Sequence, residues 1–165
     1  MSLSFLPYVR VQSVTELTVE VLKQRDIRLL MLDFDNTIVP YTTDVPTPEM
    51  ESWLRSVLAS DITLCVVSNS KRDRPVVFCK KYGIHCITHA GKPSPKGLLQ
   101  AMEHFGIPKQ QCALAGDQIY TDTLAANRAG VRGVLVKAIH NHNIWLKLRH
   151  VAEMPFIWAA HKRKI

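Results

Sequence analysis

Apolar and polar positions along this chain form two alternating kinds of segment. Short continuous apolar runs, typical of strands buried on both faces of a parallel sheet, cover residues 28–33, 62–67, 84–88, 112–115 and 133–138. The segments between them carry apolar residues at helical spacing, and the predicted helices cover residues 13–25, 47–58, 72–82, 96–105 and 121–129. The pattern therefore predicts five strands separated by helices.

Residues with capping preferences mark the ends of several predicted helices. Ser13 and Glu16 form a capping box, and Thr47 followed by Pro48 is typical of an N-cap and a first-turn proline. Glycines follow three of the helices, at Gly83, Gly106 and Gly130. These residues support the boundaries that the hydrophobic pattern indicates.

Strands that alternate with helices over short connections predict a parallel sheet covered on both faces. The predicted fold class is α/β, a doubly wound parallel five-stranded sheet. A length of 165 residues allows one such domain and leaves too little chain for a second. We expect a single domain over residues 1–165, with its motif core at 26–138 and a basic amphipathic tail at 141–165.

Composition and charge narrow the class of protein. Hydrophobic residues make up 47% of the chain and charged residues 21%, as in ordinary globular proteins. No apolar run approaches the ~18 residues of a membrane span, and the first residues lack the features of a secretory signal. The net charge of +7 favours anionic partners such as phosphorylated substrates, nucleic acid or an acidic lipid surface. Scattered cysteines without a C-x-x-C pair favour reduced thiols and a cytoplasmic setting.

Two acids, Asp33 and Asp35, follow the apolar run Leu29–Leu32 directly. Ionised carboxylates resist burial unless something pairs with them. Side chains two residues apart on a strand point the same way, so both acids are expected at the carboxyl end of the sheet. There they could bind a hard cation such as Mg²⁺, divide into nucleophile and proton donor, or do both. A strand followed by an ordinary polar turn is the alternative.

Polar side chains also follow the later strands of the predicted sheet. These residues are Ser68, Asn69, Lys92, Asp117 and Asp122. Taken singly, each fits a turn, a solvated loop charge or an acid at a helix N-terminus. Ligands bind at the carboxyl ends of strands in such sheets, and this combination of carboxylates, hydroxyl and lysine suits a phosphoryl group held with Mg²⁺.

Four motifs in this order resemble those of the haloacid dehalogenase-like (HAD) phosphatases, over residues 26–138. They are Asp33-Phe34-Asp35-Asn36-Thr37, Val66-Val67-Ser68-Asn69, Lys92-Pro93-Ser94-Pro95 and Gly116-Asp117-Gln118-Ile119-Tyr120-Thr121-Asp122. Phe34 stands where leucine is common in the family, and both side chains are apolar. The resemblance implies a Mg²⁺-dependent hydrolase of phosphate monoesters, because an acid at position 35 can protonate an alkoxide leaving group.

The resemblance also implies catalytic roles. Asp33 would attack phosphorus to give an aspartyl-phosphate, and Asp35 would protonate the leaving oxygen and then activate water. Lys92 would neutralise charge on the nucleophile and the phosphoryl group, with Lys96 as the alternative lysine.

For the substrate and the metal, the resemblance implies two further sets of residues. Substrate binding would fall to Ser68, Asn69 and Thr37, with the Ser68 hydroxyl on a phosphoryl oxygen. The Mg²⁺ ligands would be the side chains of Asp33 and Asp117 and the backbone carbonyl of Asp35, supported by Asp122.

The spacing of the motifs leaves no room for a cap domain, since a helix and a strand fill each interval, at residues 36–67 and 70–91. An open site could accept a phosphate on a large or surface-bound molecule. Leu6-Pro7, Asp35-Asn36-Thr37 and Asn127-Arg128-Ala129-Gly130 resemble the YqeG-like, type IIIA branch, which includes phosphatidylglycerophosphate phosphatases. This branch implies a lipid phosphate substrate.

The tail adds a separate observation. Apolar and aromatic residues such as Trp145 and Trp158 precede the basic run His161-Lys162-Arg163-Lys164, a combination that suits peripheral contact with an anionic membrane. The alternative is an apolar face packed on the sheet and a solvated basic end. His140 and His142 either edge the site or are ordinary loop residues.

Several functions stay open at this point. A soluble sugar phosphate, nucleotide or phosphoprotein is the alternative substrate, and a phosphorylatable signalling domain is the alternative to an enzyme. No nucleic-acid partner is expected.

Overall fold

A computed structural model describes residues 4–139 of the chain. Its strands are β1 (Val9–Val11), β2 (Leu29–Leu32), β3 (Thr63–Val67), β4 (His85–Ile87), β5 (Cys112–Gly116) and β6 (Arg132–Val136). Its helices are α1 (Val19–Gln24), α2 (Pro48–Leu58), α3 (Arg74–Tyr82), α4 (Lys96–Phe105) and α5 (Leu124–Ala129). The predicted tail at 141–165, with His140 and His142, lies outside the described residues.

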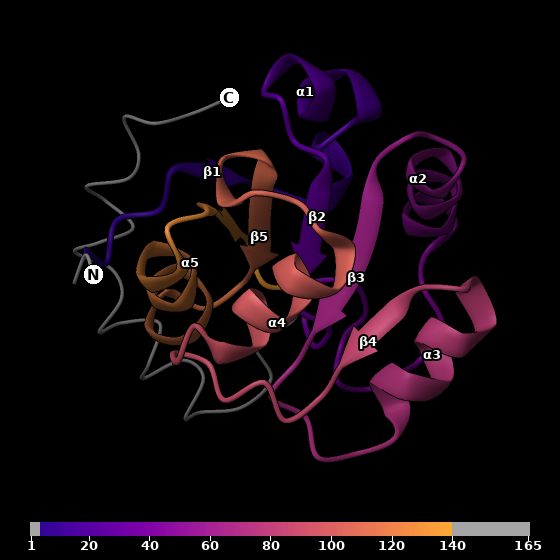
Figure 1. The fold of residues 1–165 in the computed structure, drawn as a ribbon. Coiled ribbons are helices and arrows are strands. Elements are labelled where there is room, and N and C mark those ends of the chain that lie inside the picture. The colour runs from indigo at the N-terminus through magenta and orange to yellow at the C-terminus, as the bar shows by residue number, and fades with distance from the viewer. Residues whose placement is uncertain (1–3, 140–165) are drawn as a thin grey trace.

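The six strands form one sheet in the order β1-β6-β5-β2-β3-β4, and every neighbouring pair is parallel. Strand β2 lies inside the sheet, where Leu32 pairs with Val66 of β3 on one side and with Ala115 of β5 on the other. The strands therefore end at a common edge, and the arrowheads of β2, β3 and β4 point toward it in Figure 1. The α/β doubly wound fold is confirmed.

Side chains of β2 alternate between two hydrophobic cores, one on each face of the sheet. Leu30 and Leu32 pack with residues of α1, α2 and α3, whereas Leu29 and Met31 pack with residues of α4 and α5. All four side chains are fully buried. Burial on both faces explains why this strand reads as a continuous apolar run and not as an alternating one. Helices α4 and α5 cover the face toward the viewer in Figure 1.

The predicted count of five strands is wrong by one. The additional strand is β1, which has three residues and pairs with β6 at the edge of the sheet. A strand this short gives no clear periodicity, and its pairing depends on a partner more than 120 positions away, Val134 opposite Val9.

Two predicted helices also differ in detail. The capping box of Ser13 and Glu16 is present, but it starts a 3₁₀ turn at Val14–Glu16, and α1 begins separately after its own N-cap, Thr18. The helix predicted over 121–129 begins with a π-helical turn at Ile119–Thr123. Thr47, Pro48 and Gly83 have the capping roles that the sequence predicts.

Within the described residues, the carboxyl edge of the sheet carries no inserted domain. The connection from β2 to β3 contains α2, and the connection from β3 to β4 contains α3. Within residues 4–139, no helix has both the length and the apolar character needed to cross a membrane. In the described part of the chain, the loops that follow β2, β3, β4 and β5 therefore surround the ends of the strands.

Candidate active site

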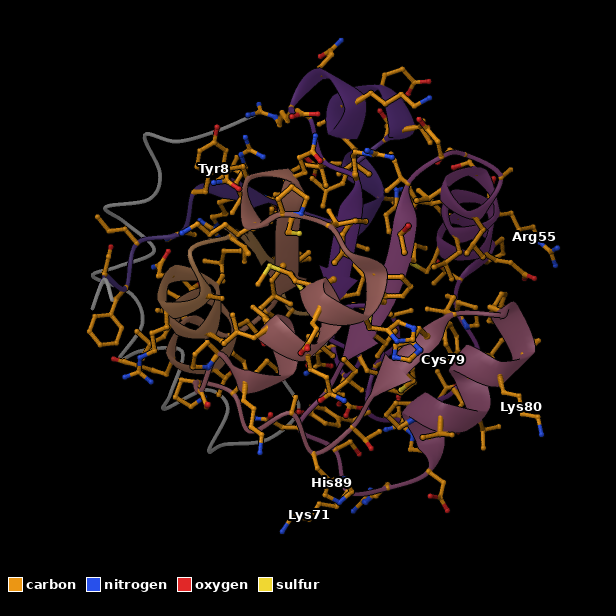
Figure 2. The ribbon with its side chains drawn as sticks, in the orientation of Figure 1. Tyr8, Arg55, Lys71, Cys79, Lys80 and His89 are labelled. Carbon is orange, nitrogen blue, oxygen red and sulfur yellow. The ribbon has the colours of Figure 1, made fainter. Side chains whose placement is uncertain are left out.

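Residues from four strand ends line one cavity of about 540 Å³ at the carboxyl edge of the sheet. Asp33 and Asp35 follow β2, Ser68 follows β3 and Lys92 follows β4. The remaining lining residues are Tyr41, Asn69, Ser70, Lys71, Arg72, Arg74, Gln118 and Thr121. This volume lies within the range of roughly 300–1,000 Å³ that is usual for small-molecule pockets. Lys71 and His89 mark this edge in Figure 2.

Lys92 connects two carboxylates at the floor of the cavity. Its Nζ lies 2.6 Å from Oδ1 of Asp33, to which it donates a hydrogen bond, and 2.7 Å from Oδ1 of Asp122, with which it forms an ion pair. All three residues are buried. A buried charge is tolerated when it is paired, so each member of this group requires the others.

A third carboxylate, that of Asp117, lies close to the two that Lys92 contacts. Ligand oxygens of Asp33, Asp117 and Asp122 lie within 4.8 Å of one another. When both are ionised, Asp33 and Asp122 together carry one more negative charge than the Lys92 ammonium between them. A divalent cation would offset negative charge in this group, and carboxylate oxygens are the ligands that Mg²⁺ prefers.

The pKa values reflect the same imbalance. Burial raises the pKa of the Asp33 carboxyl to about 7, and Lys92 opposes this shift while Asp122 and Asp35 add to it. Burial lowers the pKa of the Lys92 ammonium, but Asp122 and Asp33 outweigh burial and raise it above its usual value. Lys92 therefore stays protonated, whereas the charge on Asp33 needs a further cation nearby.

Asp122 is positioned by the turn that precedes it. Its Oδ2 accepts a hydrogen bond of 3.1 Å from the backbone N–H of Gln118. The carboxyl group also lies against Gly116, where an added Cβ would come within 2.4 Å of Asp122 Cγ and 2.6 Å of its Cβ. Glycine at the end of β5 therefore leaves the space that Asp122 fills.

Asn69 holds the loop that carries Lys92. Its side-chain amide donates to the carbonyl oxygen of Lys92 at 2.8 Å and accepts from the N–H of Lys92 at 2.8 Å. The sequence predicts a substrate contact for Asn69, which stays a prediction. In the structure both ends of the amide bind backbone and fix the position of the lysine.

Asp35 has a different partner from Asp33. Its Oδ1 accepts a hydrogen bond of 2.8 Å from Nη1 of Arg74, at the start of α3. The same guanidinium pairs with Asp44 and donates to the carbonyl oxygens of Pro40 and Thr43 at 3.2 and 3.0 Å. Burial raises the pKa of the Asp35 carboxyl, and Arg74 opposes that shift. The Asp35 carboxyl group lies outside the cluster of Asp33, Asp117 and Asp122.

Ser68 and Thr37 take different places relative to the cavity. Ser68 is buried at the cavity wall, and its Oγ accepts a hydrogen bond of 3.0 Å from the N–H of Ser70. Thr37 is also buried, but it lines a second cavity beside residues 136–139 and not the cavity of Asp33. Its predicted role in substrate binding has no support from this placement and stays a prediction.

Sequence reasoning missed the contacts of Arg74 and the pairing of Asn69 with the Lys92 backbone. An arginine followed by proline at a helix start gives no signal of an ion pair across 39 positions. The Ser-Asn pair at the end of β3 did mark Asn69 as a site residue, but not the group that it binds.

The chain is similar in sequence to known proteins. A family model of HAD-hydrolase-like proteins matches residues 89–143. The chain is 33% identical over 132 residues to the probable phosphatase YqeG of Bacillus subtilis (strain 168). This match covers 80% of this chain and 77% of YqeG. The chain is 28% identical over 162 residues to phosphatidylglycerophosphate phosphatase 1, chloroplastic/mitochondrial, of Arabidopsis thaliana, but spans only 43% of that protein.

A solved structure shares the fold. The 3-deoxy-D-manno-octulosonate 8-phosphate phosphatase of Moraxella catarrhalis, in complex with magnesium ion, phosphate ion and KDO, matches with a TM-score of 0.51 and 17% identity. The match covers 85% of this chain and 95% of that one. The relationship to YqeG, together with the matching family model, shows that the chain belongs to the HAD-superfamily phosphatases and is a phosphatase of the YqeG-like type.

Proposed function

We propose that this phosphatase is a Mg²⁺-dependent phosphomonoester hydrolase that works through an aspartyl-phosphate on Asp33. The observation that carries the proposal is the environment of Asp33. Its carboxyl group lies at the end of the interior strand β2, 2.6 Å from the Lys92 ammonium and within 4.8 Å of two further carboxylates. A nucleophilic carboxylate, a fixed cation and a set of metal ligands therefore meet at one end of the cavity.

The residues present fit a divalent metal. Asp33, Asp117 and Asp122 supply carboxylate oxygens, and a divalent cation would offset the negative charge that Lys92 leaves on Asp33 and Asp122. When bound, Mg²⁺ would supply electrostatic stabilisation of the negative charge on the transferring phosphoryl group. The backbone carbonyl of Asp35 is proposed as a further ligand.

The proposed roles of the side chains follow from their positions. Asp33 attacks phosphorus and breaks the bond to the leaving oxygen, and Asp35 gives its proton to that oxygen. Asp35 then takes a proton from a water molecule, and this water hydrolyses the aspartyl-phosphate. The Lys92 ammonium offsets negative charge on Asp33 and on the phosphoryl oxygens. Asn69 fixes the loop of Lys92 and so keeps the ammonium in this position. Lys96 is exposed at the start of α4, which supports Lys92 as the lysine of the site.

A lipid phosphate such as phosphatidylglycerophosphate is the proposed substrate. The Arabidopsis relative carries that substrate in its name, and the cavity is not covered by an inserted domain between β2 and β4. We also propose a cytoplasmic protein that meets the membrane surface through residues 141–165. A soluble sugar phosphate, nucleotide or phosphoprotein is the second candidate.

Release of inorganic phosphate from a substrate panel tests this function. The panel contains micellar phosphatidylglycerophosphate, a sugar phosphate, a nucleoside monophosphate and a phosphopeptide, each with Mg²⁺ and with a chelator. We expect Mg²⁺-dependent release, fastest from the lipid. Equal rates with all substrates would refute the lipid proposal, and no dependence on the metal would refute the metal proposal.

Independently of turnover, Mg²⁺ at 100 times its dissociation constant should stabilise the fold by about 2.7 kcal/mol.

Replacing Asp35 by Asn should slow turnover by roughly 10²- to 10⁴-fold, because the leaving oxygen loses its proton donor. The loss should be larger for an alkyl phosphate than for p-nitrophenyl phosphate, whose leaving group needs less help from an acid. Comparing kcat for the two substrates measures this difference. Asp44→Asn is the matched control, since Asp44 contacts the same Arg74 from outside the reaction. Equal losses with both substrates would argue against the acid role.

A further inference from the structure

We propose that Lys71 and Arg72 form a subsite for a second anionic group, such as a phosphodiester, on the alcohol part of the substrate. Both residues line the cavity that contains Asp33, Ser68 and Lys92. The proposal rests on the proposed phosphatase function, and it specifies which phosphate monoesters the site prefers.

The positive charges of Lys71 and Arg72 are not balanced by an ion pair within the described part of the chain. The other two cations of the cavity are each held by two acids: Lys92 by Asp33 and Asp122, and Arg74 by Asp35 and Asp44. Among residues 4–139, neither Lys71 nor Arg72 forms an ion pair with an acidic side chain. Two unpaired cations in a cavity wall attract an anion from the ligand.

The loop that carries these cations starts at the phosphoryl end of the cavity. Ser68, the proposed phosphoryl contact, accepts from the N–H of Ser70 at 3.0 Å, and Ser70 accepts from the N–H of Arg72 at 3.1 Å. The backbone of Arg72 is therefore tied to Ser68 through two successive hydrogen bonds. Lys71 and Arg72 therefore lie on the loop that begins beside the proposed phosphoryl contact.

The position of Asp35 gives the direction of the leaving group. Asp35 donates its proton to the leaving oxygen, so the alcohol part of the substrate extends from the side of Asp35. Asp35, Lys71 and Arg72 line the same cavity. A second anion on the alcohol therefore meets Arg72 and its neighbour Lys71.

A matched pair of soluble substrates tests the subsite. The first is glycerol 3-phosphate, and the second carries a methyl phosphodiester on the other terminal hydroxyl group. We expect kcat/KM to be roughly tenfold higher for the second, since both cations are exposed to water and each contact is modest. In the double variant Lys71→Gln/Arg72→Gln, this ratio should fall to about one, and added salt should lower the wild-type ratio.

The control is Lys80→Gln/Lys81→Gln, which removes the same charge from the opposite end of α3. Lys80 and Lys81 lie in the last turn of α3, and Figure 2 shows Lys80 on the flank of the molecule, away from Lys71. Its ratio should equal that of the wild type. An unchanged ratio in Lys71→Gln/Arg72→Gln, or an equal fall in the control, would overturn the subsite.

Two further outcomes separate this inference from others. If the double variant loses activity only on phospholipid vesicles and keeps its preference among soluble substrates, the two cations attract the bilayer and the subsite proposal is wrong. If the wild type hydrolyses neither substrate and releases no phosphate from the substrate panel either, the proposed function fails. Calorimetric dissociation constants for the two compounds then decide the subsite, which requires tighter binding of the phosphodiester compound by the wild type only.

Discussion

Replacing Asp33 by Asn is expected to lower kcat by at least ~10⁴-fold, the largest effect that we foresee for any substitution in the site. The amide keeps the shape of the carboxyl group but cannot attack phosphorus, so no aspartyl-phosphate forms. Stopped-flow release of phosphate measures the loss. Mass spectrometry of the wild type during turnover should detect a phosphoryl adduct on the peptide that contains Asp33.

The stability of this variant separates a chemical cause from a structural one. Asp33→Asn removes one of the two carboxylates that contact Lys92, and Lys92 keeps its ion pair with Asp122. The midpoint of thermal unfolding without metal should therefore not fall. Asp61→Asn, at an exposed carboxylate paired with Lys23, should leave kcat unchanged. Activity of Asp33→Asn within tenfold of the wild type would show that another group is the nucleophile.

Replacing Lys92 by Met is expected to impair both the fold and the reaction. The apolar side chain leaves Asp33 and Asp122 buried without their shared cation. Removing one partner of a buried ion pair typically costs about 3–5 kcal/mol, so the free energy of unfolding should fall by that amount in the absence of metal. Loss of a fixed positive charge beside the phosphoryl group should also reduce kcat by roughly 10²- to 10³-fold.

Urea unfolding with and without Mg²⁺ measures the first effect, because a bound divalent cation replaces part of the lost charge. Lys96→Met is the matched control, four positions further along and exposed at the start of α4. It should behave as the wild type in both assays. The reverse result, with the larger loss in Lys96→Met, would transfer the role of the phosphoryl-contacting lysine to Lys96.

Much of the architecture could be predicted because the elements carry local signals. Strand β2 is buried on both faces and reads as an unbroken apolar run, and α2 begins where Thr47 and Pro48 predict. Strand β1 could not be predicted, since three residues give no period and the pairing with β6 is made by chain topology. The division of the first helix into a 3₁₀ turn and α1 likewise depends on how residues 17 and 18 leave the turn, which the capping box does not determine.

The site was predictable to the extent that it follows from strand ends. Parallel strands bring Asp33, Ser68, Lys92 and Asp117 to one edge in any fold of this topology. Contacts between side chains of different loops were not predictable in the same way. Arg74 reaches Asp35 across 39 positions and Asn69 reaches the Lys92 backbone across 23, and neither distance leaves a pattern in the sequence.

The glycine at the end of β5 has a consequence for how such chains can diverge. The volume that a Cβ would need at position 116 is filled by the carboxyl group of Asp122. A relative with a larger residue at 116 would have to carry a shorter side chain at 122 or a different turn between them, and Lys92 would then lose one of its two acids. Positions 116, 122 and 92 are therefore expected to change together, which links one residue without a side chain to the charge balance of the whole cavity.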